Sequence, residues 1–229
     1  MPAPIAAFKV SPERLLDQAR ASLDLLRAPE NADLRAELSA VGLEGVRFTF
    51  ELEDAVLALA TARADQVQLS AALDEEREQD RLLAEEGFRW LARLHARARL
   101  AAAGGADPEG IFPQRLGYRA LPRARGAGVE AELARVLPEL DGLAAVLAPH
   151  GLDAGFIEEG RQLSRGLQRA RARTATVADR RKTATTAVRG AEQALITALR
   201  RLVAADEATC LERPGRRRAF PLSLLLPGR

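Results

Sequence analysis

Two long stretches without proline most constrain what this 229-residue chain can fold into. Residues 50–103 hold a single glycine, Gly87, and residues 153–209 repeat the proline-free pattern. A helix of about 55 residues is about 80 Å long, far longer than a usual globular helix. Aromatic residues are only 4% of the chain, which disfavours a β-sandwich core. The sequence predicts an all-α fold, an elongated helical bundle built on two long antiparallel coiled-coil-like helices with shorter helices packed at the ends.

Three shorter helices are expected around the two long ones. Ser11-Pro12-Glu13 is typical of a helix start, and leucines at helical spacing follow it. The predicted short helices cover residues 11–28, 31–41 and 129–148. The glycine-rich stretch 104–128 holds three prolines, so we expect a long loop there.

The start of the first long helix allows two interpretations. Val46, Phe48, Phe50 and Leu52 alternate with period two, which fits a brief extended segment. However, Thr49 is followed closely by acidic residues, a pattern typical of a capped first helical turn. We favour a helix that begins near residue 50.

A heptad pattern in residues 153–209 predicts how the long helices pair. Its core positions include Leu167, Leu195 and Leu202. Loop 104–128 can span about 80 Å, enough to cross back along the helix 129–148 and leave the long helices antiparallel. Equal counting from this loop places the acidic run 74–81 opposite Arg180, Arg181 and Lys182.

Composition and charge narrow the class of protein. A single cysteine, Cys210, excludes an intrachain disulfide framework, and no apolar run is long enough to cross a bilayer. We therefore expect a cytoplasmic protein with residues 1–212 as one helical bundle and residues 213–229 as a C-terminal tail. Charge is segregated: residues 29–86 are strongly acidic, whereas residues 87–125 and 156–182 are basic.

The usual catalytic constellations are missing from the sequence. His95 and His150 lack the Glu-x-x-His spacing of dimetal bundles, and Cys210 has no histidine near it in sequence. We expect no catalytic residue, no cofactor and no metal site, and hence a protein that is not an enzyme. His95 is interpreted as a surface or seam residue.

An arginine-rich end of the bundle is the first candidate contact surface. Arginines recur every four residues on both long helices, and the loop adds more. Such a surface could bind phosphates, an acidic membrane or an acidic partner. Alternatively, the arginines pair with nearby acids and keep the bundle soluble. The set comprises Arg89, Arg93, Arg97, Arg115, Arg119, Arg123, Arg125, Arg161, Arg165, Arg169 and Arg173.

The C-terminal tail is the second candidate. A proline- and arginine-rich connector precedes a short apolar end, which is how docking peptides are built. Alternatively, the tail folds back and buries its apolar side chains on the bundle itself. The residues concerned are Phe220, Leu222, Leu224, Leu225 and Leu226.

Two functions follow as hypotheses. The first is a non-enzymatic structural or adaptor protein that acts through helix-mediated self-association or by docking to a larger assembly, with a protein or itself as partner. The alternative is a polyanion-binding module that uses the arginine-rich end to bind nucleic acid or an acidic membrane surface.

Overall fold

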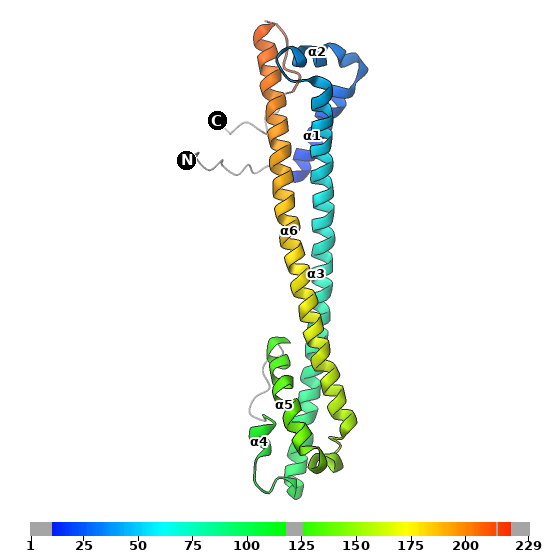
Figure 1. Cartoon of the computed structure of the whole chain (residues 1–229), viewed down its shortest axis with the longest axis vertical. Coiled ribbons are helices and arrows are strands. Elements are labelled where there is room, and N and C mark those ends of the chain that lie inside the picture. Colours follow the sequence, from blue (N-terminus) through cyan, green and yellow to red (C-terminus); the bar gives the residue numbers. More distant parts are fainter. Residues whose placement is uncertain (1–10, 118–125, 214, 221–229) are drawn as a thin grey trace, which may run out of the picture. The chain divides into compact units, whose positions relative to one another are not determined.

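The computed structural model describes residues 11–117, 126–213 and 215–220, which form helices and no strand (Figure 1). The predicted all-α helical bundle is confirmed. The α-helices are α1 (Pro12–Arg27), α2 (Ala32–Ala40), α3 (Gly45–Ala101), α4 (Phe112–Arg115), α5 (Gly126–Leu147) and α6 (Ala154–Glu212). The chain forms two compact units: the first unit comprises residues 1–68 and 181–229, and the second unit comprises residues 69–180. Both α3 and α6 contribute to each unit.

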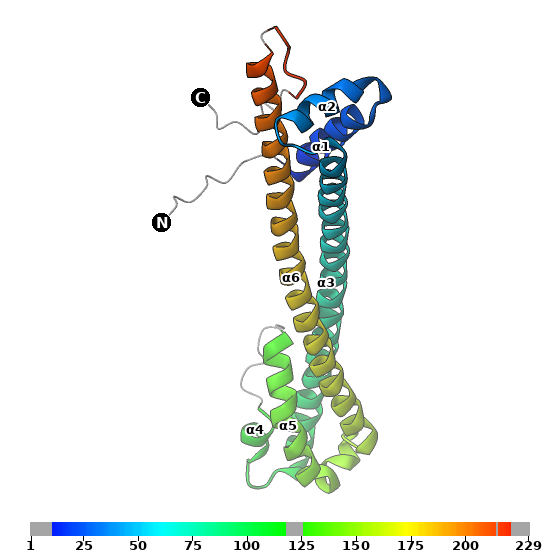
Figure 2. The ribbon, with the colours of Figure 1, turned by 45° about the horizontal axis from the view of Figure 1, so that its top comes forward.

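In the first unit, α1 and α2 pack against α3 and α6, as Figures 1 and 2 show. Ser11 caps α1 by accepting a hydrogen bond from the Arg14 amide at 3.4 Å. Leucines from all four helices fill the core, and those that are completely buried are Leu26, Leu38, Leu52, Leu59, Leu195, Leu199 and Leu202. Burial of these side chains supplies most of the stability of the unit.

The first unit pairs α3 with α6 in antiparallel fashion. The Gln66 amide nitrogen lies 3.1 Å from the Thr185 hydroxyl, and Glu51 lies 3.0 Å from Arg201. Residue numbers therefore fall along α6 as they rise along α3. The leucines that the heptad pattern assigns to the core of this part of α6 are fully buried, as predicted.

The helix α3 begins at Gly45, five residues before the predicted start, and the segment 46–52 is helical. The Ser39 hydroxyl accepts the Gly45 amide at 3.1 Å, and Thr49 donates to the Gly45 carbonyl at 2.7 Å instead of capping the helix. A Cβ atom at position 45 would lie only 3.0 Å from the Arg35 carbonyl oxygen. Glycine thus lets α3 start in close contact with α2.

In the second unit, α5 runs parallel to α3, and both run antiparallel to α6. Figures 1 and 2 show α5 beside the later part of α3. Position 87 of α3 faces Val129 and Leu133 of α5. This arrangement is the one that the crossing loop was expected to allow. The core holds Trp90, Leu94, Leu140 and Leu167, all completely buried.

The predicted register of the long helices is wrong. In the second unit, Glu76 pairs with Arg173 at 3.0 Å, and Asp80 lies 3.8 Å from Arg171. The acidic run 74–81 therefore faces α6 about two turns before Arg180. Charge alone cannot tell whether the acidic run pairs with Arg171 and Arg173 or with the basic residues 180–182.

The predicted loop 104–128 contains regular structure that the sequence analysis missed. Both side-chain oxygens of Asp107 accept backbone amides, from Ile111 at 2.8 Å and Phe112 at 3.0 Å, and so hold the start of α4. Asp153 caps α6 by accepting the Phe156 amide at 2.9 Å.

Candidate functional site

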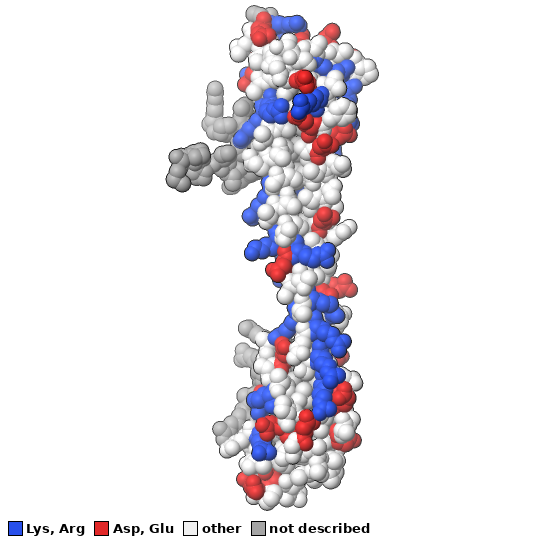
Figure 3. All heavy atoms as spheres, in the orientation of Figure 1, with Lys and Arg blue, Asp and Glu red and all other residues white. Residues whose placement is uncertain are grey.

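Most of the predicted arginine set is engaged in ion pairs within the second unit. Figure 3 shows arginine and lysine side chains gathered along the part of α6 that belongs to this unit, with acidic side chains beside them. The ion pairs are Arg89 with Glu85, Arg93 with Glu159, Arg115 with Glu139, Arg161 with Asp141 and Glu158, Arg165 with Glu158, and Arg173 with Glu76. This pairing favours the interpretation that these arginines keep the bundle soluble.

Three members of the arginine set, Arg119, Arg123 and Arg125, lie outside the described residues. Arg169 is exposed and has no acidic partner within 4 Å in the described part of the chain. Arg89 and Arg165 are also mostly exposed, and their acidic partners lie 3.7 and 3.8 Å away. The described members of the set therefore leave little basic surface without an acidic partner.

Arg93 and Arg97 have a packing role. Their guanidinium groups lie 5.6 and 5.0 Å from the centre of the Phe156 ring. That ring stacks on Trp90 with 4.8 Å between the ring centres. Arg97 also donates to the Gly151 carbonyl. These two arginines close the end of the core and stabilise it through cation–π contacts.

His95 and Cys210 lie in different units of the structure. His95 is buried, with the Leu116 backbone after α4 and Glu132 of α5 near its ring, so it is a core residue and not a surface residue. Cys210 lies in the first unit, where its sulfur atom is 3.6 Å from Arg216. Among the described residues, no group of three or more His, Cys, Asp or Glu side chains is arranged to hold a metal ion.

The burial of His95 predicts a pH dependence of stability. Burial lowers the pKa of this imidazole below its usual 6.5, although a hydrogen bond to the Leu116 backbone and the charge of Glu132 partly oppose the shift. The unfolded chain therefore binds a proton near pH 6.5 that the folded chain binds only at lower pH. We expect the free energy of unfolding to fall as the pH drops from about 7 to 5.5.

Urea denaturation across this pH range, followed by circular dichroism, measures the effect. His95→Gln should flatten the slope because it removes the titrating group, whereas His150→Gln should retain it. Equal slopes for His95→Gln and the unchanged protein would contradict the assignment.

The start of the C-terminal tail is fastened to the first unit. The Asp206 carboxylate, only 1% exposed, accepts the amides of Ala219 at 3.0 Å and Phe220 at 3.1 Å. It also pairs with Arg216 at 3.0 Å, and Arg216 reaches Glu37 at 2.8 Å. The Phe220 side chain is buried in the core. The described part of the tail therefore folds back onto its own bundle.

Arg216 belongs to the proline- and arginine-rich connector of the tail, and its side chain is only 15% exposed. The other tail residues proposed for docking, Leu222, Leu224, Leu225 and Leu226, lie outside the described residues.

The sequence did not lead us to predict an exposed apolar face on α3 in the first unit. It consists of Val46, Phe50, Glu53, Leu57, Ala60, Ala64 and Val67, and we call it the α3 apolar face. Its four large apolar side chains are 62–66% exposed. The spacing alternates between four and three residues, which keeps all seven positions on one side of a helix. Six of these seven positions are apolar.

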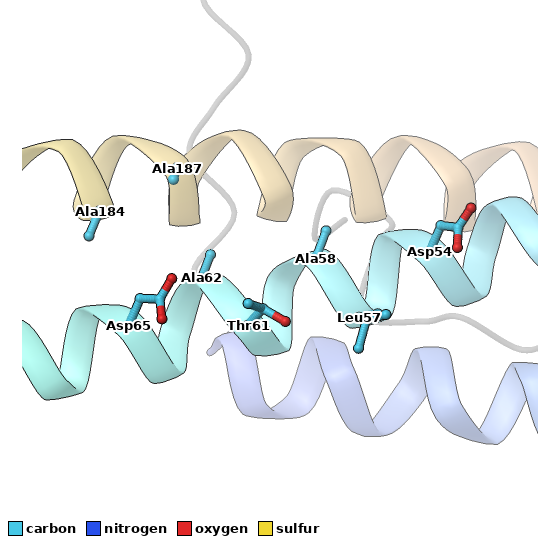
Figure 4. A pocket seen from close by; sticks show the side chains of 8 residues that line it. All are labelled: Asp54, Leu57, Ala58, Thr61, Ala62, Asp65, Ala184 and Ala187. Carbon is cyan, nitrogen blue, oxygen red and sulfur yellow. The ribbon is translucent and has the colours of Figure 1, made fainter.

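A shallow groove of about 430 Å³ runs beside this face, between α3 and α6 (Figure 4). Alanines line it from both helices, Ala58 and Ala62 from α3 and Ala184 and Ala187 from α6. In Figure 4, Ala58 and Ala62 point toward α6, whereas Leu57 points away from it. The lining also includes the carboxylates of Asp54 and Asp65. Small side chains leave room for another helix to approach closely.

No helix within the described ranges combines the length and apolar character needed to cross a lipid bilayer. Comparison of the chain with protein-family profiles, with curated proteins and with solved structures finds no match.

Proposed function

We propose that this protein is a non-enzymatic structural or adaptor protein that acts by binding a helix on the α3 apolar face. The observation that supports the proposal is the exposure of Val46, Phe50, Leu57 and Val67 on one side of a single helix. Burying a large apolar side chain is worth about 1.5–3 kcal/mol, so four of them provide substantial binding energy. Exposed apolar patches of this kind mark interaction sites.

The chemistry of the face favours a helix as the bound element. Its one charged residue, Glu53, already pairs with Arg27 of α1. The period of 3.5 residues matches the seam along which two helices interlock. The groove beside the face offers a second, alanine-lined surface for the same helix.

Polyanion binding remains a second candidate because Arg169 is exposed and has no acidic partner among the described residues. Titration with salt distinguishes it, because binding through phosphates weakens steeply as salt rises. Binding of DNA, RNA or acidic vesicles that Arg165→Glu and Arg169→Glu abolish would favour this candidate over helix docking.

Site-specific photo-crosslinking in the native host tests the docking proposal. A photoreactive phenylalanine derivative is placed at position 50 or 57, and the crosslinked products are identified by mass spectrometry. The matched control carries the same group at Leu211, which is 84% exposed on α6 of the same unit. We expect discrete adducts to a protein chain from positions 50 and 57 that position 211 does not give.

The proposal fails if positions 50 and 57 give no protein adduct. It also fails if they give the same products as position 211, because the apolar face would then have no specific partner.

A further inference from the structure

We infer that the helix bound on the α3 apolar face is the same face of a second copy of this chain, in an antiparallel pair. This inference rests on the proposed function and names its partner. The face covers 21 residue steps, from Val46 to Val67, which is about 32 Å of helix. A symmetric dimer needs one self-complementary surface, and the side chains of this face meet that condition in size and in charge.

Side-chain size supports the antiparallel direction. If the two-fold axis lies level with residue 55, Phe50 of one copy faces Ala60 of the other, and Val46 faces Ala64. Phe50 and Val46 then each meet an alanine, so these large side chains fill the space that the small ones leave between the helices. Leu57 meets Glu53, whose carboxylate is held by Arg27.

A parallel pair in register would place identical side chains opposite each other. It would place Phe50 against Phe50 and Glu53 against Glu53, whereas the alanines at positions 60 and 64 would face each other across a gap. Like charges directly opposite each other and unfilled volume both weaken an interface. The antiparallel arrangement avoids both costs.

Charge along one edge of the face gives an independent argument. Arg47 and Asp65 are separated by 18 residues, which is five helical turns, so they lie on the same edge of α3. Arg47 is 75% exposed and pairs only with Glu51 of its own helix among the described residues. Asp65 is exposed and has no ion-pair partner within the described ranges.

In the antiparallel pair, Arg47 of one copy lies within two residues, about 3 Å, of the level of Asp65 in the other copy. An arginine side chain spans that offset. Symmetry creates the contact twice, once at each end of the interface. The two ends of the face are therefore complementary to each other and not to a parallel copy.

Sedimentation velocity of the full chain over a concentration series tests the inference. We expect a reversible monomer–dimer equilibrium that Leu57→Asp abolishes and Leu211→Asp leaves unchanged. Arg47→Asp and Asp65→Arg should each weaken the dimer about tenfold, because each replaces an attraction by a repulsion at both ends. The double variant Arg47→Asp/Asp65→Arg should restore the dimer. Circular dichroism of each variant confirms that it is folded.

Disulfide trapping in a Cys210→Ser background tests the direction. A mixture of Phe50→Cys and Ala60→Cys proteins should form the mixed disulfide, whereas each variant alone should form little. Efficient self-crosslinking of each variant alone would overturn the antiparallel arrangement.

The outcomes separate this inference from the proposed function. A protein that stays monomeric while positions 50 and 57 crosslink to a different protein overturns the second copy as partner but leaves helix docking intact. A monomer in which those positions crosslink to residues 1–10 or 221–229 of the same chain overturns both. Failure of the double charge reversal to restore the dimer overturns the proposed pairing of Arg47 with Asp65.

Discussion

Replacing Asp206 by alanine is expected to lower the free energy of unfolding by about 3–5 kcal/mol. The carboxylate is buried and accepts three hydrogen bonds, two from the backbone of the tail and one from Arg216. Its removal leaves the largely buried Arg216 without one of its two acidic partners and leaves two amides without an acceptor. Phe220 also loses the contacts that hold it against the core. Urea denaturation followed by circular dichroism measures the loss.

The matched control is Glu207→Ala, the next residue along α6. Glu207 pairs with Arg218 at 3.0 Å, but both side chains are at least 40% exposed, so the pair contributes at most about 1 kcal/mol. If Asp206→Ala and Glu207→Ala destabilise the protein equally, the buried carboxylate does not fasten the tail.

The positions of the helices could be predicted because the signals for them are local. Ser11 caps α1 as expected, Asp153 caps α6, and proline is absent from the interiors of both long helices. The start of α3 was misplaced because it depends on Ser39, which precedes it by six residues and accepts the Gly45 amide. A cap supplied by the preceding helix gives no pattern in the first turn itself.

The alternation of Val46, Phe48, Phe50 and Leu52 has a physical cause that the sequence alone did not reveal. Phe48 and Leu52 are buried in the core of the first unit, whereas Val46 and Phe50 lie on the exposed α3 apolar face. Within each face the apolar residues are four positions apart, and the two faces are offset by two positions. Together they give an apolar residue at every second position, which is the period of a strand. For this reason the alternating pattern did not reveal the α3 apolar face.

The register of the long helices could not be predicted from charge. Exposed ion pairs contribute about 0.2–1 kcal/mol each, and α6 offers arginines at 171 and 173 as well as at 180 and 181. An acidic run can therefore pair at several registers with similar energy. In the second unit, the Trp90 ring packs against Gly160 of α6, where any side chain would clash, and this contact favours the observed register.

The second large loss of stability is expected from substitution of Trp90. Trp90 is completely buried, and its indole N–H donates to the Phe156 carbonyl at 3.0 Å. Trp90→Ala should lower the free energy of unfolding by about 3–5 kcal/mol, through lost burial and the cavity left behind. Leu100→Ala, at a side chain that is 71% exposed on the same helix, should change it by less than about 0.5 kcal/mol. Urea denaturation followed by circular dichroism compares the two.

Gly160 of α6 tests the same contact from the other side. A Cβ atom at this position would lie 2.4 Å from Cζ2 of Trp90, closer than any real contact. Gly160→Ala should therefore destabilise the second unit by about 1–3 kcal/mol, although alanine favours a helix over glycine by about 1 kcal/mol. Trp90 is the only tryptophan, so its fluorescence during urea denaturation reports on this unit directly.

The control for Gly160→Ala is Gly142→Ala in α5 of the same unit, where an added Cβ atom would meet nothing within 4 Å. Only the intrinsic helix preference acts there, so Gly142→Ala should stabilise the unit by up to about 1 kcal/mol. The two substitutions add the same methyl group to a helix, and their opposite signs would isolate the contact with Trp90. If both substitutions stabilise the unit, the ring of Trp90 does not lie against Gly160 and cannot be what sets the register of α3 and α6 in this unit.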